Sequence, residues 1–252
     1  MTQKRLNFLH HPSFPPGYNM ALDWWLLQSA ESPVFRFYFW NLPVLSLGYR
    51  QQFRPPDRLG ELADRFPVVQ RPTGGGYLLH AGDFSFSLVF PTSHPWTEAS
   101  IKTLYSRVVD LFEQVALEQN LLSRSERGSG GSFAADCLAA PAAHEPSQTG
   151  KKWIAISQLR HQKAALLHGS VFFDSTAWPG DVPLKTPFFL PLKNASDRRK
   201  YFSAVMTRLQ GHLFPSDNIS AIHIDHADWL EISRLAENFR VQHLSELPVF
   251  HR

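Results

Sequence analysis

Two short segments of the sequence contain residue types that could do chemistry. One is the glycine-rich stretch from Arg71 to His80, and the other is the stretch from Cys137 to Lys152. The first offers bare backbone and a guanidinium group, and the second offers a thiol and an ammonium group. Nucleophilic attack on a carbonyl compound uses groups of these kinds. We therefore treat the two segments as one candidate site for an enzyme that handles acyl groups.

The first segment contains three consecutive glycines, Gly74, Gly75 and Gly76, between Thr73 and Tyr77. Glycines permit positive φ and leave a corner of the chain without side chains, so a ligand can lie against backbone N–H groups. The preceding arginine can offer five donors to a carboxylate or phosphate. The stretch lacks the Lys-Ser/Thr of a phosphate loop and does not fit the dinucleotide fingerprint. Taken alone, it is also typical of a plain hairpin corner.

Cys137 is the single cysteine of the chain, which excludes an internal disulfide and a thiolate zinc cluster. A free thiol with a pKa of about 8.5 is only about 3% thiolate at neutral pH. An ammonium group that lowers this pKa by about two units would make about three quarters of it nucleophilic. Lys152 can supply that charge, whereas Asp136 would oppose it. A lone cysteine is also often a small buried apolar residue, and Gly-Lys-Lys is typical of a solvated turn.

Periodicity predicts the elements that must position these segments. The expected helices are Asn19–Gln28 with Asn19 as its cap, a short one at Pro56–Arg65, Ile101–Gln119, and Asp228–Leu244 with Leu230, Ile232, Leu235 and Phe239 facing inward. The expected strands are Val34–Trp40, Val44–Leu47, Pro67–Arg71 entering the glycine turn, Ser85–Phe90 leaving it, and a pair at Lys152–Gln158 and Ala164–Phe173. We expect loops at Ser123–Ser132 and Pro183–Pro191.

Helices and strands are interspersed without regular βαβ alternation. This order predicts an α+β fold with a mixed, largely antiparallel sheet and flanking helices. At 252 residues, with no evident linker or internal repeat, we expect one domain over residues 1–252.

Composition narrows the classes of function. Apolar residues make up 43% and charged residues 19%, and the net charge is +3. No lysine or arginine stripe accompanies this weak positive charge, which argues against nucleic-acid binding. Val34–Trp40 is the longest apolar run, Arg36 interrupts it, and it is too short to cross a membrane. No signal peptide is evident, so we expect a cytoplasmic protein whose weakly basic surface suits an acidic carrier protein.

A series of motifs runs in order along residues 19–173. Its members are Asn19-Met20-Ala21-Leu22-Asp23, Arg36-Phe37-Tyr38, Leu45-Ser46-Leu47-Gly48-Tyr49, Arg71-Pro72-Thr73-Gly74-Gly75, Cys137, Pro141, Glu145, Gly150, Lys152, Gln158 and His168-Gly169-Ser170. The ordered set resembles the lipoate–protein ligase and octanoyltransferase family. It is most similar to the cysteine-dependent octanoyltransferases that look like lipoate–protein ligase A. This order favours the functional interpretation of both segments.

The resemblance implies an acyltransferase that needs no cofactor or metal. Such enzymes take an octanoyl group from acyl carrier protein onto the cysteine and pass it to a lysine of a lipoyl domain. The acceptors are the glycine-cleavage H protein and the E2 subunits of 2-oxoacid dehydrogenases. The implied fold is the one shared with biotin ligases and class II aminoacyl-tRNA synthetases.

The resemblance also implies a role for each site residue. Cys137 is the nucleophile, and Lys152 lowers its pKa and touches the acyl carbonyl. The acyl tunnel is lined by the glycine loop and its flanks, and closed by a histidine-glycine pair. The implied substrate-binding residues are Arg71, Thr73, Gly74, Gly75, Gly76, Tyr77, His80, His168 and Gly169.

The sequence departs from the family pattern at several positions. Gln70 stands where a second arginine is usual, Ala81 where an aspartate often follows the histidine, and Ala142 where serine follows the proline. After Lys152 the family usually has Gly-Ser-Ala, whereas this chain has Ala155-Ile156-Ser157. The bulky isoleucine is expected to reshape the pocket and bears on the acyl chain length accepted.

Three alternatives stay open. An ATP-dependent lipoate–protein ligase, using ATP and Mg²⁺, is favoured by Gly76, although such ligases do not need Cys137. A catalytically silent protein that binds lipoyl domains or acyl groups would explain the altered segment after Lys152. The third is a metal site at His223-Ile224-Asp225-His226, where two side chains would share a strand face.

Overall fold

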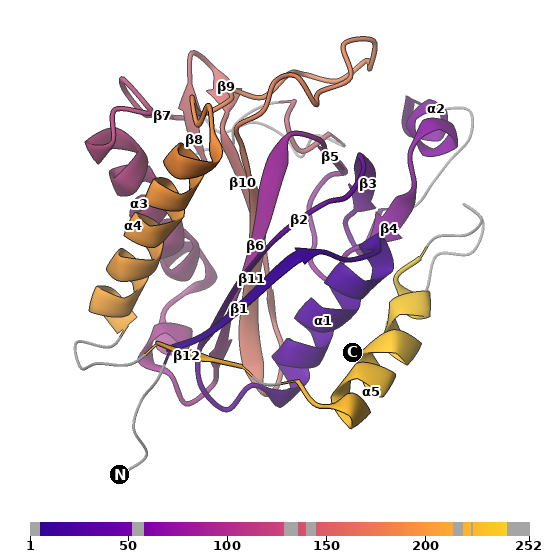
Figure 1. Cartoon of the computed structure of the whole chain (residues 1–252), viewed down its shortest axis with the longest axis vertical. Helices are drawn as coiled ribbons and strands as arrows, with labels where there is room; N and C mark the ends of the chain where they lie inside the picture. The colour runs from indigo at the N-terminus through magenta and orange to yellow at the C-terminus, as the bar shows by residue number, and fades with distance from the viewer. Residues whose placement is uncertain are drawn as a thin grey trace.

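A six-stranded mixed sheet runs through the centre of the molecule (Figure 1). The computed structural model describes residues 6–51, 58–128, 136–139, 145–213, 219–222 and 224–240. The sheet has the order β10-β11-β6-β2-β1-β12. Its strands are β10 (Ile154–Arg160), β11 (Ala164–Phe172), β6 (Asp83–Pro91), β2 (Val34–Phe39), β1 (Leu6–Ser13) and β12 (Ile219–Ala221).

The first four strands of this sheet are antiparallel, whereas β1 pairs in parallel with both β2 and β12. Two small sheets complete the structure. One has the order β4-β3-β5, from β4 (Val68–Gln70), β3 (Val44–Leu47) and β5 (Leu78–His80), and the other has the order β7-β8-β9, from β7 (Glu126–Arg127), β8 (Pro146–Gln148) and β9 (Lys151–Lys152). The predicted α+β class with a mixed, largely antiparallel sheet is confirmed.

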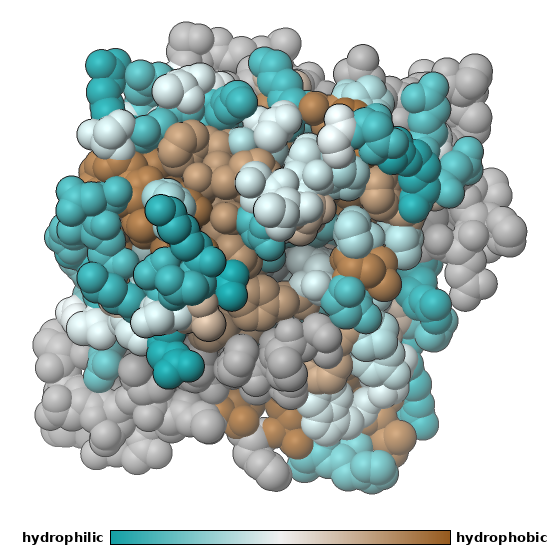
Figure 2. Space-filling view, turned by 45° about the horizontal axis from the view of Figure 1, so that its top comes forward, coloured by the Kyte–Doolittle hydropathy of each residue, from teal (hydrophilic) through white to brown (hydrophobic). Residues whose placement is uncertain are grey.

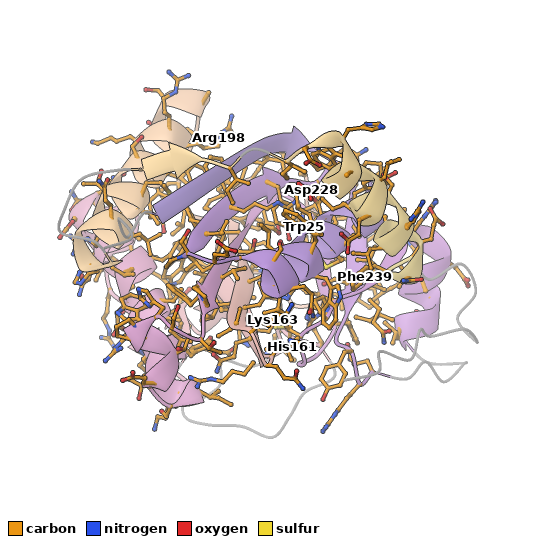
Figure 3. All side chains as sticks on the ribbon, turned by 90° about the horizontal axis from the view of Figure 1, so that it is seen from below. Trp25, His161, Lys163, Arg198, Asp228 and Phe239 are labelled. Carbon is orange, nitrogen blue, oxygen red and sulfur yellow. The ribbon has the colours of Figure 1, made fainter. Side chains whose placement is uncertain are left out.

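Helices cover both faces of the large sheet. The helices are α1 (Pro16–Ser29), α2 (Arg58–Arg65), the 3₁₀ turn η1 (Pro95–Glu98), α3 (Ile101–Glu118), α4 (Ala195–Leu213) and α5 (His226–Asn238). One apolar core lies between the sheet and the α3–α4 pair, and a second lies between the sheet and the α1–α5 pair. Figure 3, seen from below the view of Figure 1, shows α5 alongside α1.

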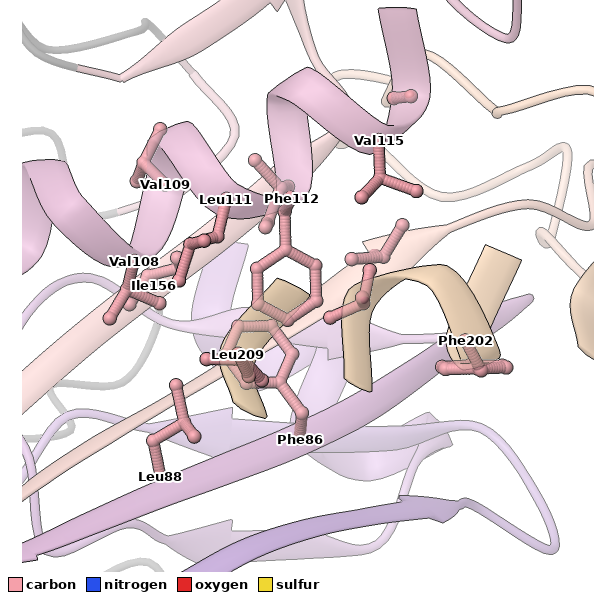
Figure 4. Packing of buried hydrophobic residues seen from close by; sticks show 14 of the residues in the cluster. Phe86, Leu88, Val108, Val109, Leu111, Phe112, Val115, Ile156, Phe202 and Leu209 are labelled. Carbon is pink, nitrogen blue, oxygen red and sulfur yellow. The ribbon is translucent and has the colours of Figure 1, made fainter. Parts of the chain in front are cut away.

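Successive side chains of the central strand β6 point to opposite faces of the large sheet. Phe84, Phe86 and Leu88 enter the α3–α4 core, where Phe86 stacks on Phe112 with ring centroids 4.3 Å apart (Figure 4). Side chains at i and i+2 share a face of a strand, so the intervening serines point toward α1. Ser85 and Ser87 are small, and this leaves room for a site on that face.

Two predicted helix starts are wrong. α1 begins at Pro16 because proline suits the first helical position, where its missing N–H is not needed. Asn19 therefore lies inside α1 and does not cap it. α5 begins at His226, after a capping box in which Asp225 and Asp228 exchange backbone-to-side-chain hydrogen bonds. Residues 241–244 of that predicted helix lie outside the described residues.

The inward face predicted for α5 is correct only in part. Ile232 and Phe239 are buried, but Leu230 is 48% exposed because it lies on the opposite side of the helix. The strand that leaves the glycine turn is β5, which pairs with β3 in the small sheet, so the predicted Ser85–Phe90 strand comes only after a second turn. Sequence periodicity missed β1, α4 and β12.

The predicted loop Pro183–Pro191 has no regular structure, and Leu190 in it is buried. The predicted loop Ser123–Ser132 includes β7, and part of it lies outside the described residues. Among the helices of the described residues, none is both long and apolar enough to pass through a membrane.

Gly82 makes the turn from β5 into β6 and offers a test of the fold. Its φ is +69°, and a Cβ atom there would lie 1.9 Å from the carbonyl oxygen of Asp174. We expect Gly82→Ala to lower the free energy of unfolding by about 2 kcal/mol or more, since strain and overpacking add. Urea denaturation measures this loss.

Gly180 provides the matched control, because nothing lies within 4 Å of a Cβ built on it. Gly180→Ala should change the free energy of unfolding by about 0.5 kcal/mol or less. Equal effects of the two substitutions would contradict the described turn.

Candidate active site

A cavity of about 210 Å³ lies between the large sheet and the β4-β3-β5 sheet. Its lining residues come from α1, from strands of all three sheets, from the glycine turn and from the cysteine segment. They are Met20, Tyr38, Ser46, Arg71, Gly75, Gly76, Leu78, His80, Ser85, Asp136, Cys137, Glu145, Lys152, Ala155, Ile156, Ser157, His168, Gly169 and Ser170. All the predicted site residues line it except Thr73, Gly74 and Tyr77, which lie directly behind the lining.

The backbone brings the two predicted segments together. Asp136 forms a parallel bridge with Tyr77, directly after the three glycines, and the Cys137 N–H donates to the Tyr77 carbonyl at 2.9 Å. Lys152, on β9, then donates from Nζ to the Cys137 carbonyl oxygen at 2.5 Å. Sequence spacing could not predict this contact, and the structure supplies it. Figure 2 turns the end of the molecule that carries β9 toward the viewer, and apolar and hydrophilic residues lie side by side on its surface.

The Lys152 ammonium also forms an ion pair with Glu145. Only 4% of the Lys152 side chain and 13% of the Glu145 side chain are exposed. A buried ammonium needs acceptors, because desolvation would otherwise favour its neutral form. The carbonyl oxygen of Cys137 and the carboxylate of Glu145 provide two. Glu145 was quoted from sequence as part of a motif, but its contact with Lys152 was not anticipated.

Arg71 faces the glycine turn from its inner side. Its guanidinium donates to the carbonyl oxygens of Gly74 at 2.8 Å, Gly76 at 2.6 Å and Ser46 at 3.2 Å. Burial lowers the pKa of Arg71 to about 10, against a smaller opposing effect of Cys137. These donors therefore hold the turn in shape, and the predicted contact of Arg71 with a substrate stays a prediction. Gly75, with φ +98°, is the turn position that requires glycine.

A chain of hydrogen bonds ties the glycine turn to the large sheet. Thr73 Oγ1 lies 2.6 Å from Ser157 Oγ and 2.6 Å from His168 Nε2, and His168 Nδ1 lies 3.1 Å from Asp23 Oδ2. Arg36 donates to the other oxygen of Asp23 at 2.6 Å. All these groups except Ser157 are buried. The chain runs from α1 to the cavity wall and fixes its position.

The ion pair of Asp23 with Arg36 governs the charge states in this chain of hydrogen bonds. Burial raises the pKa of Asp23, but Arg36 and His168 together outweigh burial and hold this pKa below its ordinary value. Burial lowers the pKa of His168 despite the adjacent carboxylate. A neutral imidazole with Nδ1–H toward Asp23 then accepts from Thr73 at Nε2. Sequence motifs quoted Asp23 and Arg36 without predicting this contact.

His80 occupies the other wall of the cavity. Its Nε2 lies 2.9 Å from Ser46 Oγ, and its Nδ1 lies 3.0 Å from Asp83 and 3.1 Å from Ser170 Oγ. The Trp40 ring lies over it, with centroids 4.5 Å apart. Asp83 was not singled out from sequence, although its position three residues after a histidine was an available signal.

Cys137 is half-buried, and its thiol is not activated in this state. Burial raises its pKa most strongly, Glu145 and Asp136 raise it further, and Lys152 and Arg71 lower it. The net pKa lies above that of a free thiol. Lys152 therefore acts in the predicted direction, but the prediction of a net lowered pKa is wrong, because burial and the Glu145 carboxylate outweigh it.

The altered segment after Lys152 lies in the cavity wall. Ala155, Ile156 and Ser157 all line it. Ile156 pairs with Gly169 across β10 and β11, and a Cβ on that glycine would lie 2.9 Å from Ile156 Cγ1 and 2.3 Å from the Ala155 carbonyl oxygen. Gly169 thus accommodates the bulkier isoleucine. Pro141 and Ala142 lie outside the described residues.

The suggested metal site finds no support among the residues that the structure describes, where no group of three possible ligands occurs. Asp225 caps α5 through its side chain, and His226 is exposed at the start of that helix. His223 lies outside the described residues.

Alkylation of Cys137 tests the electrostatics of the site. The rate should rise with a midpoint above about pH 8.5, the pKa of a free thiol. Lys152→Met should move the midpoint higher, because it removes a positive charge that favours the thiolate. Lys151→Met is the matched control, since Lys151 is exposed on the same strand. An unchanged profile in Lys152→Met would remove the role assigned to Lys152.

Stability at mildly acidic pH tests the neutral state of His168. Its pKa is lowered in the folded protein, whereas the unfolded chain binds a proton near pH 6.5. The free energy of unfolding should therefore fall as pH drops below about 6.5, and His168→Gln should reduce this fall. His212→Gln, at an exposed position of α4, should leave the fall unchanged. The same fall in His168→Gln and the unmodified chain would contradict this assignment.

Comparison with known proteins identifies the family. The family model described as the lipoyl protein ligase A/B catalytic domain matches residues 15–218. Octanoyltransferase LipM of Carboxydothermus hydrogenoformans is 32% identical over 178 residues, 65% of this chain and 63% of the relative. The LipM of Staphylococcus epidermidis is 30% identical over 181 residues, 67% of this chain and 66% of the relative. The aligned part thus spans just under two thirds of these relatives.

Solved structures show the same fold. A lipoate-protein ligase A bound with ATP superposes with a TM-score of 0.71 at 15% identity, covering 97% of each chain. A bi-partite lipoate protein ligase from Thermoplasma acidophilum gives 0.61 at 17% identity, covering 100% of this chain and 99% of that one. The match over residues 15–218 confirms the resemblance seen in the ordered motifs. The chain belongs to the lipoyl protein ligase A/B catalytic domain family.

Proposed function

We propose that the protein is an octanoyltransferase that carries the acyl group on Cys137 and delivers it to a lysine of a lipoyl domain. The observation that carries the proposal is the contact of the buried Lys152 ammonium with the Cys137 backbone, at the wall of the cavity. The relatives named octanoyltransferase LipM support the reaction class.

The first half of the reaction transfers the acyl group between two sulfur atoms. The Cys137 thiolate attacks the carbonyl carbon of an incoming thioester, and the leaving thiol departs with one proton. Negative charge develops on the carbonyl oxygen during this step, and the Lys152 ammonium, which lines the cavity with Cys137, would stabilise it. Displacement of the Glu145 contact, or neutralisation of its charge by a bound donor, would lower the pKa of the thiol.

In the second half, an amine attacks the Cys137 thioester and forms an amide. This route needs neither nucleotide nor metal, because a thioester is already an activated acyl group. The cavity of about 210 Å³ provides space for an acyl chain beside Cys137. Tyr38, Met20 and Leu78 would contact the chain, and the thioester would lie at Cys137.

The partners follow from this chemistry. The donor is an acyl thioester on acyl carrier protein, an acidic protein that suits the net charge of +3. The acceptor is a lipoyl domain, of the glycine-cleavage H protein or of an E2 subunit. The Thermoplasma acidophilum ligase, which has the same fold, belongs to a lipoylation system that includes its E2 lipoyl domain. We propose the cytoplasm as the place of the reaction.

Intact-mass measurement tests the proposal. With octanoyl-acyl carrier protein and an apo lipoyl domain, without ATP, the protein should gain one octanoyl group that hydroxylamine removes, and the lipoyl domain should become octanoylated. Cys137→Ser should abolish both masses, because it removes the only thiol of the chain.

The ligase alternative gives a different result in the same experiment. Product and AMP formed only when ATP and free octanoate are supplied would contradict the transferase. Absence of product under both conditions, with the lipoyl domain still bound, would support a protein that binds without catalysis.

A further inference from the structure

A carboxylate stands beside the nucleophile, and the route described above gives it no chemical step. Glu145 precedes β8, contacts Lys152 Nζ and lines the cavity with Cys137. Its side chain is 13% exposed, against 4% for Lys152. Glu145 therefore reaches the buried ammonium and remains accessible to a group that enters from solvent.

The second half of the proposed reaction requires a proton acceptor. A lysine side chain arrives as an ammonium ion, because its pKa in water is about 10.4. An ammonium nitrogen has no lone pair and cannot attack a thioester. One proton must leave the nitrogen before or while the new N–C bond forms, and a positioned base accelerates such a step.

Other titratable groups of the cavity wall are poorly placed to accept this proton. Lys152 is an ammonium that already donates to two oxygens. His168 and His80 use both ring nitrogens in hydrogen bonds with neighbouring side chains. Asp136 accepts from the Leu138 N–H at 2.8 Å, which directs that carboxylate into its own turn.

We propose that Glu145 is the base that accepts a proton from the attacking amine of the acceptor lysine, an inference that rests on the proposed acyl transfer. The ammonium gives one proton to a Glu145 oxygen, and the nitrogen forms a bond to the thioester carbon. The C–S bond to Cys137 breaks, and the thiolate takes the second proton from nitrogen. Glu145 then releases its proton to water, and the resting thiol is restored.

Lys152 favours this step from the other side. A second ammonium close to a buried positive charge is destabilised, so the acceptor amine loses its proton more readily inside the site than in water. The ion pair also holds the Glu145 side chain beside the thioester position. One salt bridge thus orients the base and stabilises the oxygen charge of the transition state.

Removal of the Glu145 carboxylate should have two opposite effects. Its negative charge raises the pKa of Cys137, so its loss should increase the thiolate fraction. Its loss should also remove the proton acceptor for the amine. The thiol should become more reactive toward a simple alkylating reagent while the transfer to lysine becomes slower. A residue with a purely structural role does not separate the two rates in this way.

Glu145→Gln tests this inference in two measurements at pH 7. Iodoacetamide alkylation of the single cysteine should become faster than in the unmodified chain. The single-turnover loss of octanoyl from the acylated protein to an apo lipoyl domain should become about 100-fold slower, a usual effect of losing a base. Glu126→Gln is the matched control, since Glu126 is 39% exposed on β7, the neighbour of β8. It should change neither rate.

Each other outcome overturns the inference. If both rates fall, the role of Glu145 is structural, and if both rise, Glu145 only restrains the thiol. A loss of transfer in Asp136→Asn that exceeds the loss in Glu145→Gln assigns the base to Asp136. If Glu145→Gln does not fold, Glu145→Asp replaces it. Glu145→Asp keeps a carboxylate and should retain part of the transfer rate. A transfer rate about 100-fold below that of the unmodified chain, as expected for loss of the base, would contradict the inference. An unmodified chain that forms no acyl adduct refutes the proposed function itself.

Discussion

Burial of the Lys152 ammonium beside a thiol requires oxygen acceptors, and the chain supplies them from two separate segments. The Cys137 carbonyl oxygen accepts from one side, and Glu145 pairs from the other. The first contact fixes the cysteine turn against β9, and the second compensates the charge of the buried ammonium. Burial is the main reason that the pKa of the Cys137 thiol is raised; the Glu145 carboxylate raises it further, and Lys152 opposes both. A bound substrate that displaces Glu145 would therefore favour the thiolate.

The cavity depends on unequal side chains on the two faces of the large sheet. β6 sends its phenylalanines into the α3–α4 core and its serines toward the site. In β11, Gly169 leaves room for Ile156 of β10. The opposite wall is a glycine turn whose carbonyl groups Arg71 holds and whose Thr73 is bound to His168. Walls held by these hydrogen bonds would position a thioester for the proposed acyl transfer.

Much of this architecture could be predicted because it depends on local pattern. The strands Val34–Phe39 and Val44–Leu47 and the helix Ile101–Glu118 follow apolar periodicity closely. The ordered motifs then indicated the family and included most of the residues that line the cavity. The α4 helix was missed because its apolar residues are interrupted by many polar ones, and β1 and β12 because parallel pairing joins distant segments.

Contacts between side chains could not be predicted in the same way. The contacts of Arg71 were not predicted, because its donors face backbone oxygens of its own turn, which only the folded path of that turn reveals. The net pKa of Cys137 was misjudged because burial and Glu145 were not visible in the spacing to Lys152. The central claim is that Cys137 carries the acyl group. Peptide mapping by mass spectrometry, after brief exposure to octanoyl-acyl carrier protein without acceptor, tests it most directly. The account predicts octanoyl on the peptide that contains Cys137, and octanoyl on any other residue, or on none, would contradict it.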